Sequence, residues 1–158
     1  MKKVVLFLIF ALVCIGTVCA VDEYKDMQQA PSLDVPGAVI FDLKPVRKKI
    51  EDNIAFVNMT ETDIINFEVY YIDYNTGEWV KNKNRGRVEG YNDRDIVELD
   101  KKLVIVQKKI GGEVKDVEVW RPTNIKKVPF IAIVPKPADD YKYRTYAQSN
   151  DFYIEITK

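Results

Sequence analysis

Short runs of β-branched and aromatic residues follow one another along the chain from Gly37 onward. Glycine, asparagine and aspartate separate these runs, and apolar residues do not recur with the 3.6-residue period of a helix over any long stretch. Because no crossover helices are indicated, we expect neighbouring strands to be antiparallel. The candidate strands are 38–43, 54–58, 64–74, 78–81, 83–93, 95–99, 103–110, 113–120, 129–134, 141–147 and 152–156, of which 83–93 is weak and polar.

Two turns can be predicted from the positions of glycine residues. Gly111 and Gly112 can supply positive φ at both central positions of a two-residue hairpin loop, and Gly77 can supply the left-handed residue that closes a longer loop. We therefore expect about eight or nine short strands in an all-β fold, an antiparallel β-sandwich of immunoglobulin-like character. One short helical turn is expected within 45–52, because Pro45 suits a first helical position.

Alternation within 64–74 separates a core face from an outer face. Its odd positions are apolar up to Asp73, so they are expected to face the core. The even positions place Tyr70 and Tyr74 on the outer face, with Ile72 between them.

The position of Trp79 depends on the length of the loop before it. A three-residue loop over 75–77 places Trp79 opposite Asp73 and on the core face, whereas a four-residue loop starting at Tyr74 pairs it with Ile72 and turns it outward. The three-residue loop is preferred, because it uses Gly77 as the left-handed closing residue.

The first twenty residues have the pattern of a secretion signal. Lys2 and Lys3 precede an uninterrupted apolar run over 4–13, and small residues lead up to Ala20, after which we expect cleavage. The alternative is a retained membrane anchor, although the run is shorter than the roughly 20 apolar residues of a transmembrane helix.

After the signal, we expect a flexible tether over 21–36 and a single domain over 37–158. Cys14 and Cys19, the two cysteines of the chain, both lie in the signal. Lipidation of either cysteine is a further alternative, but the residues before them lack the usual Leu-small-small pattern. A cysteine-free exported domain after a Met-Lys-Lys start favours a periplasmic or secreted protein of a bacterial envelope.

Composition excludes several chemistries. The chain has 24 Lys and Arg, 24 Asp and Glu, and no histidine. It therefore has no histidine base and no imidazole metal site, and after cleavage no thiolate. The interspersed charges show no basic footprint for nucleic acid, and the cleaved chain carries a net charge of −2. We expect no enzymatic activity, no cofactor, and no transmembrane span after cleavage.

Two carboxylate chemistries remain as alternatives. Glycoside hydrolysis needs two carboxyl groups facing one cleft, and Glu68, Glu78 and Glu118 are candidates without a spacing that selects a pair. Calcium binding needs oxygen-bearing loops, which 92–95 and 139–140 provide.

Aromatic recognition is the third possibility. Tyrosine and tryptophan provide rigid area with a polar group, which suits a protein or a sugar, and the candidate binding residues are Tyr70, Tyr74, Trp79 and Tyr91. The sequence thus predicts an exported binding or structural module that acts through protein interaction. The alternative is a carbohydrate-binding module, so the expected partner is a protein or a polysaccharide of the cell envelope.

Overall fold

The computed structural model describes residues 23–158, so the expected signal and its cleavage site lie outside the described residues. The described part is mostly β, with 51% of it in eleven strands, more than the eight or nine expected, and only two short 3-10 turns, Lys44–Lys49 and Ile125–Lys127. The first turn begins with Pro45 near its start, as expected. Among residues 23–158, no helix is long and apolar enough to cross a membrane.

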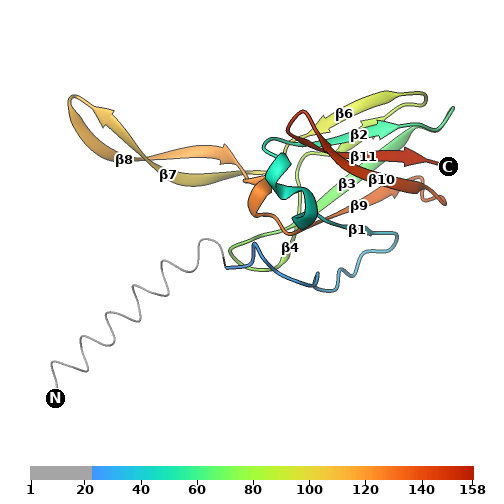
Figure 1. Ribbon diagram of the computed structural model, residues 1–158, viewed down its shortest axis with the longest axis horizontal. Coiled ribbons are helices and arrows are strands. Elements are labelled where there is room, and N and C mark those ends of the chain that lie inside the picture. The colour runs from blue at the N-terminus through green and yellow to red at the C-terminus, as the bar shows by residue number, and fades with distance from the viewer. Residues whose placement is uncertain (1–22) are drawn as a thin grey trace, which may run out of the picture.

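The strands form three sheets (Figure 1). The first contains β1 (Val39–Asp42), β9 (Phe130–Lys136), β3 (Ile65–Ile72), β4 (Trp79–Lys81) and, beside β3, β5 (Gly86–Val88). The second contains β10 (Lys142–Gln148), β11 (Asp151–Thr157), β2 (Ile54–Asn58) and β6 (Asp93–Val97). The third is a hairpin of β7 (Lys101–Ile110) and β8 (Glu113–Pro122).

One strand pair departs from the expected antiparallel arrangement. β11 lies parallel to β2, with Ile154 opposite Phe56, whereas the other pairs in the described chain are antiparallel. The expectation of a wholly antiparallel fold is therefore wrong for this pair. Nearly a hundred residues separate the two strands along the chain, so no local turn pattern in the sequence reports on their direction.

The core lies between the first two sheets. Phe56 of β2 stacks on Phe67 of β3, with ring centroids 4.5 Å apart and planes within 4°. The odd positions of β3 were expected to face this core, and all four are at most 2% exposed: Ile65, Phe67, Val69 and Tyr71. The prediction from alternation is confirmed.

Both glycine turns form, but one differs in length. Gly111 and Gly112 have φ of 60° and 85° and close a two-residue loop between β7 and β8, as predicted. Gly77 has φ of 72°, yet the loop it closes has four residues, because the backbone N–H of Asp73 bonds to Glu78 O at 2.9 Å. The carboxylate of Asp73 accepts the Asn75 N–H at 2.8 Å and starts the loop one residue early.

The register of β4 is consequently not the preferred one. Trp79 lies opposite Ile72, so its side chain is on the outer face of the first sheet and not on the core face with Tyr71. The expectation that Trp79 joins the core is wrong. Tyr70, opposite Lys81, shares the outer face.

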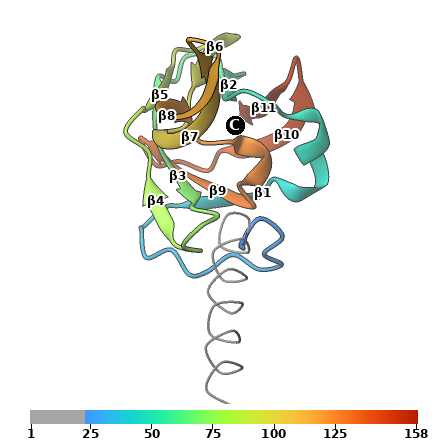
Figure 2. The ribbon, with the colours of Figure 1, turned by 90° about the vertical axis from the view of Figure 1, so that its left-hand side faces the viewer.

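The outer face of the first sheet is covered by the segment 23–36, which was expected to be a tether (Figure 2). The indole Nε1–H of Trp79 donates to the carbonyl of Pro31 at 2.9 Å. The backbone N–H of Tyr24 donates to Tyr74 O at 3.1 Å, and the Tyr24 ring lies against Gly77. Beneath this cover, Ile72 is 0% exposed although it points away from the core between the sheets. We name residues 23–36 the cover segment.

Candidate functional site

The β7–β8 hairpin projects away from the other two sheets (Figure 1). We name residues 101–122 the arm and the other described residues the body. Each strand has ten residues, which corresponds to a length of about 30 Å. The two strands pair only with each other among the described residues, so the outer edges of both are unpaired.

The arm exposes large apolar side chains. Ile105 is 69% exposed, Val114 and Trp120 are each 66% exposed, and Leu103 is 48% exposed. Leu103 lies directly opposite Trp120. Since opposite residues of an antiparallel pair point to the same side, and alternate residues of a strand do so too, all four lie on one face.

The other face of the arm is also apolar at its centre. Val104 is opposite Val119, and Val106 is opposite Val117; all four are only half-buried. A two-stranded sheet without a covering layer is marginally stable in water, and long unpaired apolar edges are usually protected in soluble proteins. The arm is therefore an exposed, partly apolar element with two unpaired edges in the described part of the chain.

The base of the arm is fixed to the body by hydrogen bonds around Asp100. Its backbone N–H donates to Asn82 Oδ1 at 2.8 Å, and its carbonyl accepts from the N–H and the hydroxyl of Thr123 at 2.9 and 2.7 Å. Its carboxylate accepts the Lys83 N–H at 2.9 Å. Asn82 and Thr123 are buried, so the arm leaves the body from a well-ordered junction.

An ion pair supports the same junction. Lys102 Nζ lies 2.7 Å from Asp73 Oδ2 and 5.1 Å from the centre of the Tyr74 ring. Partial burial raises the pKa of Asp73, but the hydrogen bonds from Lys102 and from the Asn75 N–H outweigh it, so the pKa is lowered overall. Beside the junction, a depression of about 360 Å³ is lined by Lys83, Asn84, Glu98, Asp100, Lys101 and Trp120.

Charge also distinguishes the arm from the body. Six cationic residues against three carboxylates give the arm a net charge of +3, whereas the remaining described residues carry −4. Two pairs of cations lie directly opposite each other, Lys102 with Arg121 and Lys108 with Lys115. Like charges in such positions destabilise an isolated hairpin.

The four aromatic residues proposed from the sequence do not form one surface. Tyr70 and Trp79 are half-buried on the outer face of the first sheet, where the cover segment bonds to Trp79. Tyr74 was also expected on that face, but its side chain lies in the loop after β3 and packs against the core, so this expectation is wrong. Tyr91 is 77% exposed, with φ of 58°, in the β5–β6 turn.

Sequence reasoning missed Trp120 and its neighbours on the arm. A signal was present, because 103–106 and 117–120 place apolar residues on both faces of consecutive strands around a tight glycine turn. Such a pattern indicates a strand buried on both sides, and in this fold no other sheet covers it.

The carboxylates proposed for hydrolysis lie apart. Glu68 of β3 bonds to Lys136 Nζ at 2.7 Å and lies 3.4 Å from Lys81 Nζ, and these partners lower its pKa. Glu118 lies on the arm opposite Ile105, and Glu78 is exposed beside β4. Among residues 23–158, no three or more Asp, Glu, Cys or His residues are grouped as metal ligands.

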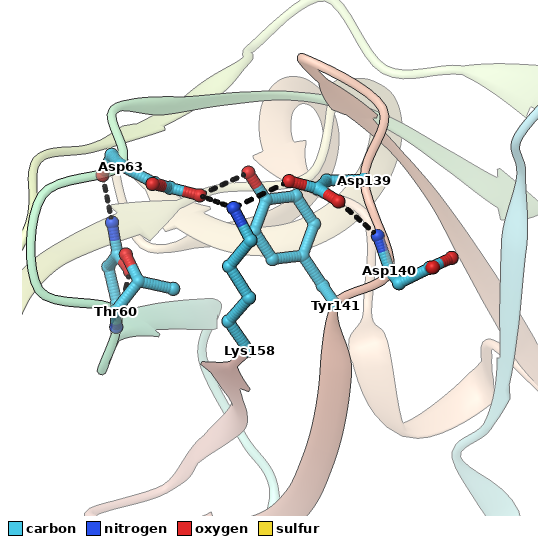
Figure 3. A network of polar contacts seen from close by, with 7 residues as sticks. Thr60, Asp63, Asp139, Asp140, Tyr141 and Lys158 are labelled. Atoms are coloured by element: carbon cyan, nitrogen blue, oxygen red, sulfur yellow. Dashed lines mark hydrogen bonds and ion pairs between the residues drawn. The ribbon is translucent and has the colours of Figure 1, made fainter.

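One of the loops proposed for calcium takes part in a polar network near the C-terminal end (Figure 3). Lys158 Nζ lies between two carboxylates, 2.6 Å from Asp139 Oδ2 and 3.2 Å from Asp63 Oδ2. The Tyr141 hydroxyl donates to Asp63 Oδ2 at 3.0 Å, and burial together with this bond raises the pKa of Tyr141 to about 12. The Lys158 ammonium group therefore occupies the position between Asp139 and Asp63 that a bound cation would take.

This network gives a pH prediction for the variant Lys158→Met. The hydrogen bond from Lys158 lowers the pKa of Asp139, and the bonds to Asp139 and Asp63 raise the pKa of Lys158. Ionised Asp139 therefore stabilises the fold at neutral pH, and this stabilisation is lost as the pH falls through the lowered pKa of Asp139. The stabilisation from protonated Lys158 is lost only as the pH rises above the ordinary lysine range. Thermal melts should show a lower Tm for the variant at about pH 7 and a smaller difference at about pH 2. An equal difference at both values would contradict the ion pair.

A second aromatic group lies on the outer face of the second sheet. Tyr146 stacks on Tyr153 with ring centroids 5.2 Å apart, and Arg94 donates to the Tyr153 hydroxyl at 3.0 Å. A depression of about 510 Å³ is lined there by Val57, Asn92, Asp93, Arg94, Tyr146, Gln148 and Tyr153.

No protein-family model matches the chain, and neither a curated protein nor a solved structure matches it. The fold and the surface features described above are thus the basis for assigning a function.

Proposed function

We propose that this protein is an exported, non-enzymatic binding module of a bacterial envelope that acts through protein interaction, with the arm as its contact element. The observation that carries this proposal is the exposure of Ile105, Val114 and Trp120 on a projecting hairpin with two unpaired edges. Exposed apolar patches and free edges are the features through which proteins bind other proteins. Export to the periplasm or the medium rests on the pattern of the first twenty residues.

The immunoglobulin-like character of the body is part of the same proposal. Its support is that two sheets pack on one core in which Phe56 and Phe67 stack. The parallel pair β2–β11 distinguishes the body from a wholly antiparallel sandwich.

Photo-crosslinking tests the arm as the contact element. A photoreactive amino acid at Ile105, on the arm, should give a covalent adduct with a protein in intact cells, identified by mass spectrometry. The matched control is Ile96 in β6, which is 50% exposed on the body. The absence of a protein adduct at Ile105, or equal adducts at both positions, would contradict the proposal.

Carbohydrate binding is a second candidate, favoured by the stacked Tyr146 and Tyr153 beside the polar depression at Arg94. Aromatic rings flanked by planar polar groups can contact sugars. Binding to a panel of envelope polysaccharides that is lost in Tyr146→Ala and kept in Trp120→Ala would favour this function over the first.

A further inference from the structure

The two free edges of the arm differ in their charge. β7 carries Lys101 and Lys102 at its base and Lys108 and Lys109 at its tip, so both of its ends are positive. If the β7 edges of two copies paired antiparallel, the tip of each would lie against the base of the other. Lysines would then face lysines at both ends, which destabilises a strand pair.

The β8 edge has opposite charges at its two ends. Glu113 lies at the tip and Arg121 lies near the base. In a two-fold antiparallel pair of β8 edges, the same patch of both copies meets itself. Glu113 of each copy then lies opposite Arg121 of the other when the pair is centred on Val117.

The same register brings exposed apolar residues together. With Val117 at the two-fold axis, Val114 of one copy lies opposite Trp120 of the other. Each of these side chains is 66% exposed in the single chain, and Trp120 already has Leu103 as its neighbour within the arm. The pair would therefore extend the apolar row of Leu103 and Trp120 to Val114 of the second copy, where the row ends at Lys109, the residue opposite Val114. It would also place Asp116 opposite Glu118 of the second copy.

We propose that the binding partner of the arm is a second copy of this chain. The two β8 edges pair with each other and form a four-stranded antiparallel sheet. The inference rests on the proposed function, since it identifies the partner of the same surface. It also provides the additional strands that a lone two-stranded hairpin lacks. Backbone hydrogen bonds along the β8 edge provide the affinity, and the charged ends provide the orientation.

A charge swap tests the pairing on the full chain without its signal, by analytical ultracentrifugation over a range of concentrations. Glu113→Arg and Arg121→Glu should each weaken dimerisation about tenfold or more, because each change creates two like-charge contacts in a two-fold dimer. The double variant should restore the affinity of the unmodified protein. Within one chain the two residues lie eight positions apart on one strand, or about 26 Å, so this restoration can arise only between copies.

Two further variants sharpen the test. Glu118→Lys should tighten the dimer, because it replaces the repulsion with Asp116 of the second copy by an attraction. Glu61→Arg changes the charge of an exposed residue on the body and should leave the affinity unchanged. Thermal melts of all variants check that the arm substitutions leave the body folded.

The outcomes separate this inference from the proposed function. A protein that stays monomeric up to about 100 μM, or a double variant that remains weak, overturns self-association through β8. If the adduct formed at Ile105 is then a different protein, the arm remains a protein-binding element with another partner. If the adduct is absent as well, both proposals fail.

Discussion

Replacing Phe56 by alanine should lower the free energy of unfolding by about 3–5 kcal/mol, the range measured for large aromatic residues in protein cores. Phe56 is 0% exposed and its ring stacks on that of Phe67, which comes from the opposite sheet. The substitution removes the contact that joins the two sheets at their centre and leaves a cavity that the rigid strands on either side fill poorly. Urea denaturation followed by circular dichroism measures the change.

Gly86 provides a sharp control for this prediction. A Cβ atom at Gly86 would lie 2.9 Å from two ring carbons of Phe56, so Gly86→Ala alone should destabilise the fold. In the Phe56→Ala background the added methyl group enters the vacated space, and its cost should decrease or disappear. Strictly additive effects of the two substitutions would contradict the close packing of these residues.

Features set by neighbours along the chain could be predicted from the sequence. The odd face of β3 takes the core because alternation fixes which residues share a side. The Gly111–Gly112 loop forms because positive φ at both positions is favourable only for residues such as glycine. The strand runs themselves follow from the high content of β-branched and aromatic residues between turns.

Features set by distant parts of the chain could not be predicted in the same way. The parallel pairing of β11 with β2 has no local signal, and the cover segment is polar without a sustained period. The register of Trp79 follows from a four-residue loop in which the Asn75 N–H donates to the Asp73 carboxylate. A change of one residue in loop length moves a whole strand to the other face, so this small local interaction had a large consequence.

The candidate site also combines features set by neighbouring residues with features set by distant parts of the chain. The sequence indicated Tyr70, Tyr74 and Trp79 as neighbours, but only Tyr70 and Trp79 share the outer face of the first sheet, and the segment that bonds to Trp79 there comes from far away in the chain. The apolar residues of the arm read as ordinary strand residues. Whether such residues are buried or exposed depends on whether another layer packs on the faces of the hairpin, which only the assembled fold shows.

Replacing Trp79 by alanine should release the cover segment and lower the free energy of unfolding by about 2–4 kcal/mol. The indole holds Pro31 by a hydrogen bond of 2.9 Å and lies opposite Ile72, which is fully buried on this face. Its loss removes apolar contact and leaves the Pro31 carbonyl without its donor. Hydrogen exchange measured by mass spectrometry should show faster exchange within the cover segment, and Trp79→Phe should retain part of the stability because it keeps an aromatic ring there.

The second tryptophan of the chain is the matched control. Trp120 is 66% exposed on the arm, so Trp120→Ala should change the stability of the body by less than about 0.5 kcal/mol while weakening self-association. The two tryptophans thus separate two roles, because Trp79 holds the cover segment on the body and Trp120 belongs to the proposed binding surface. A stability loss at Trp120 with none at Trp79 would contradict this separation, since it would mean that the arm, and not the cover segment, completes the folded body.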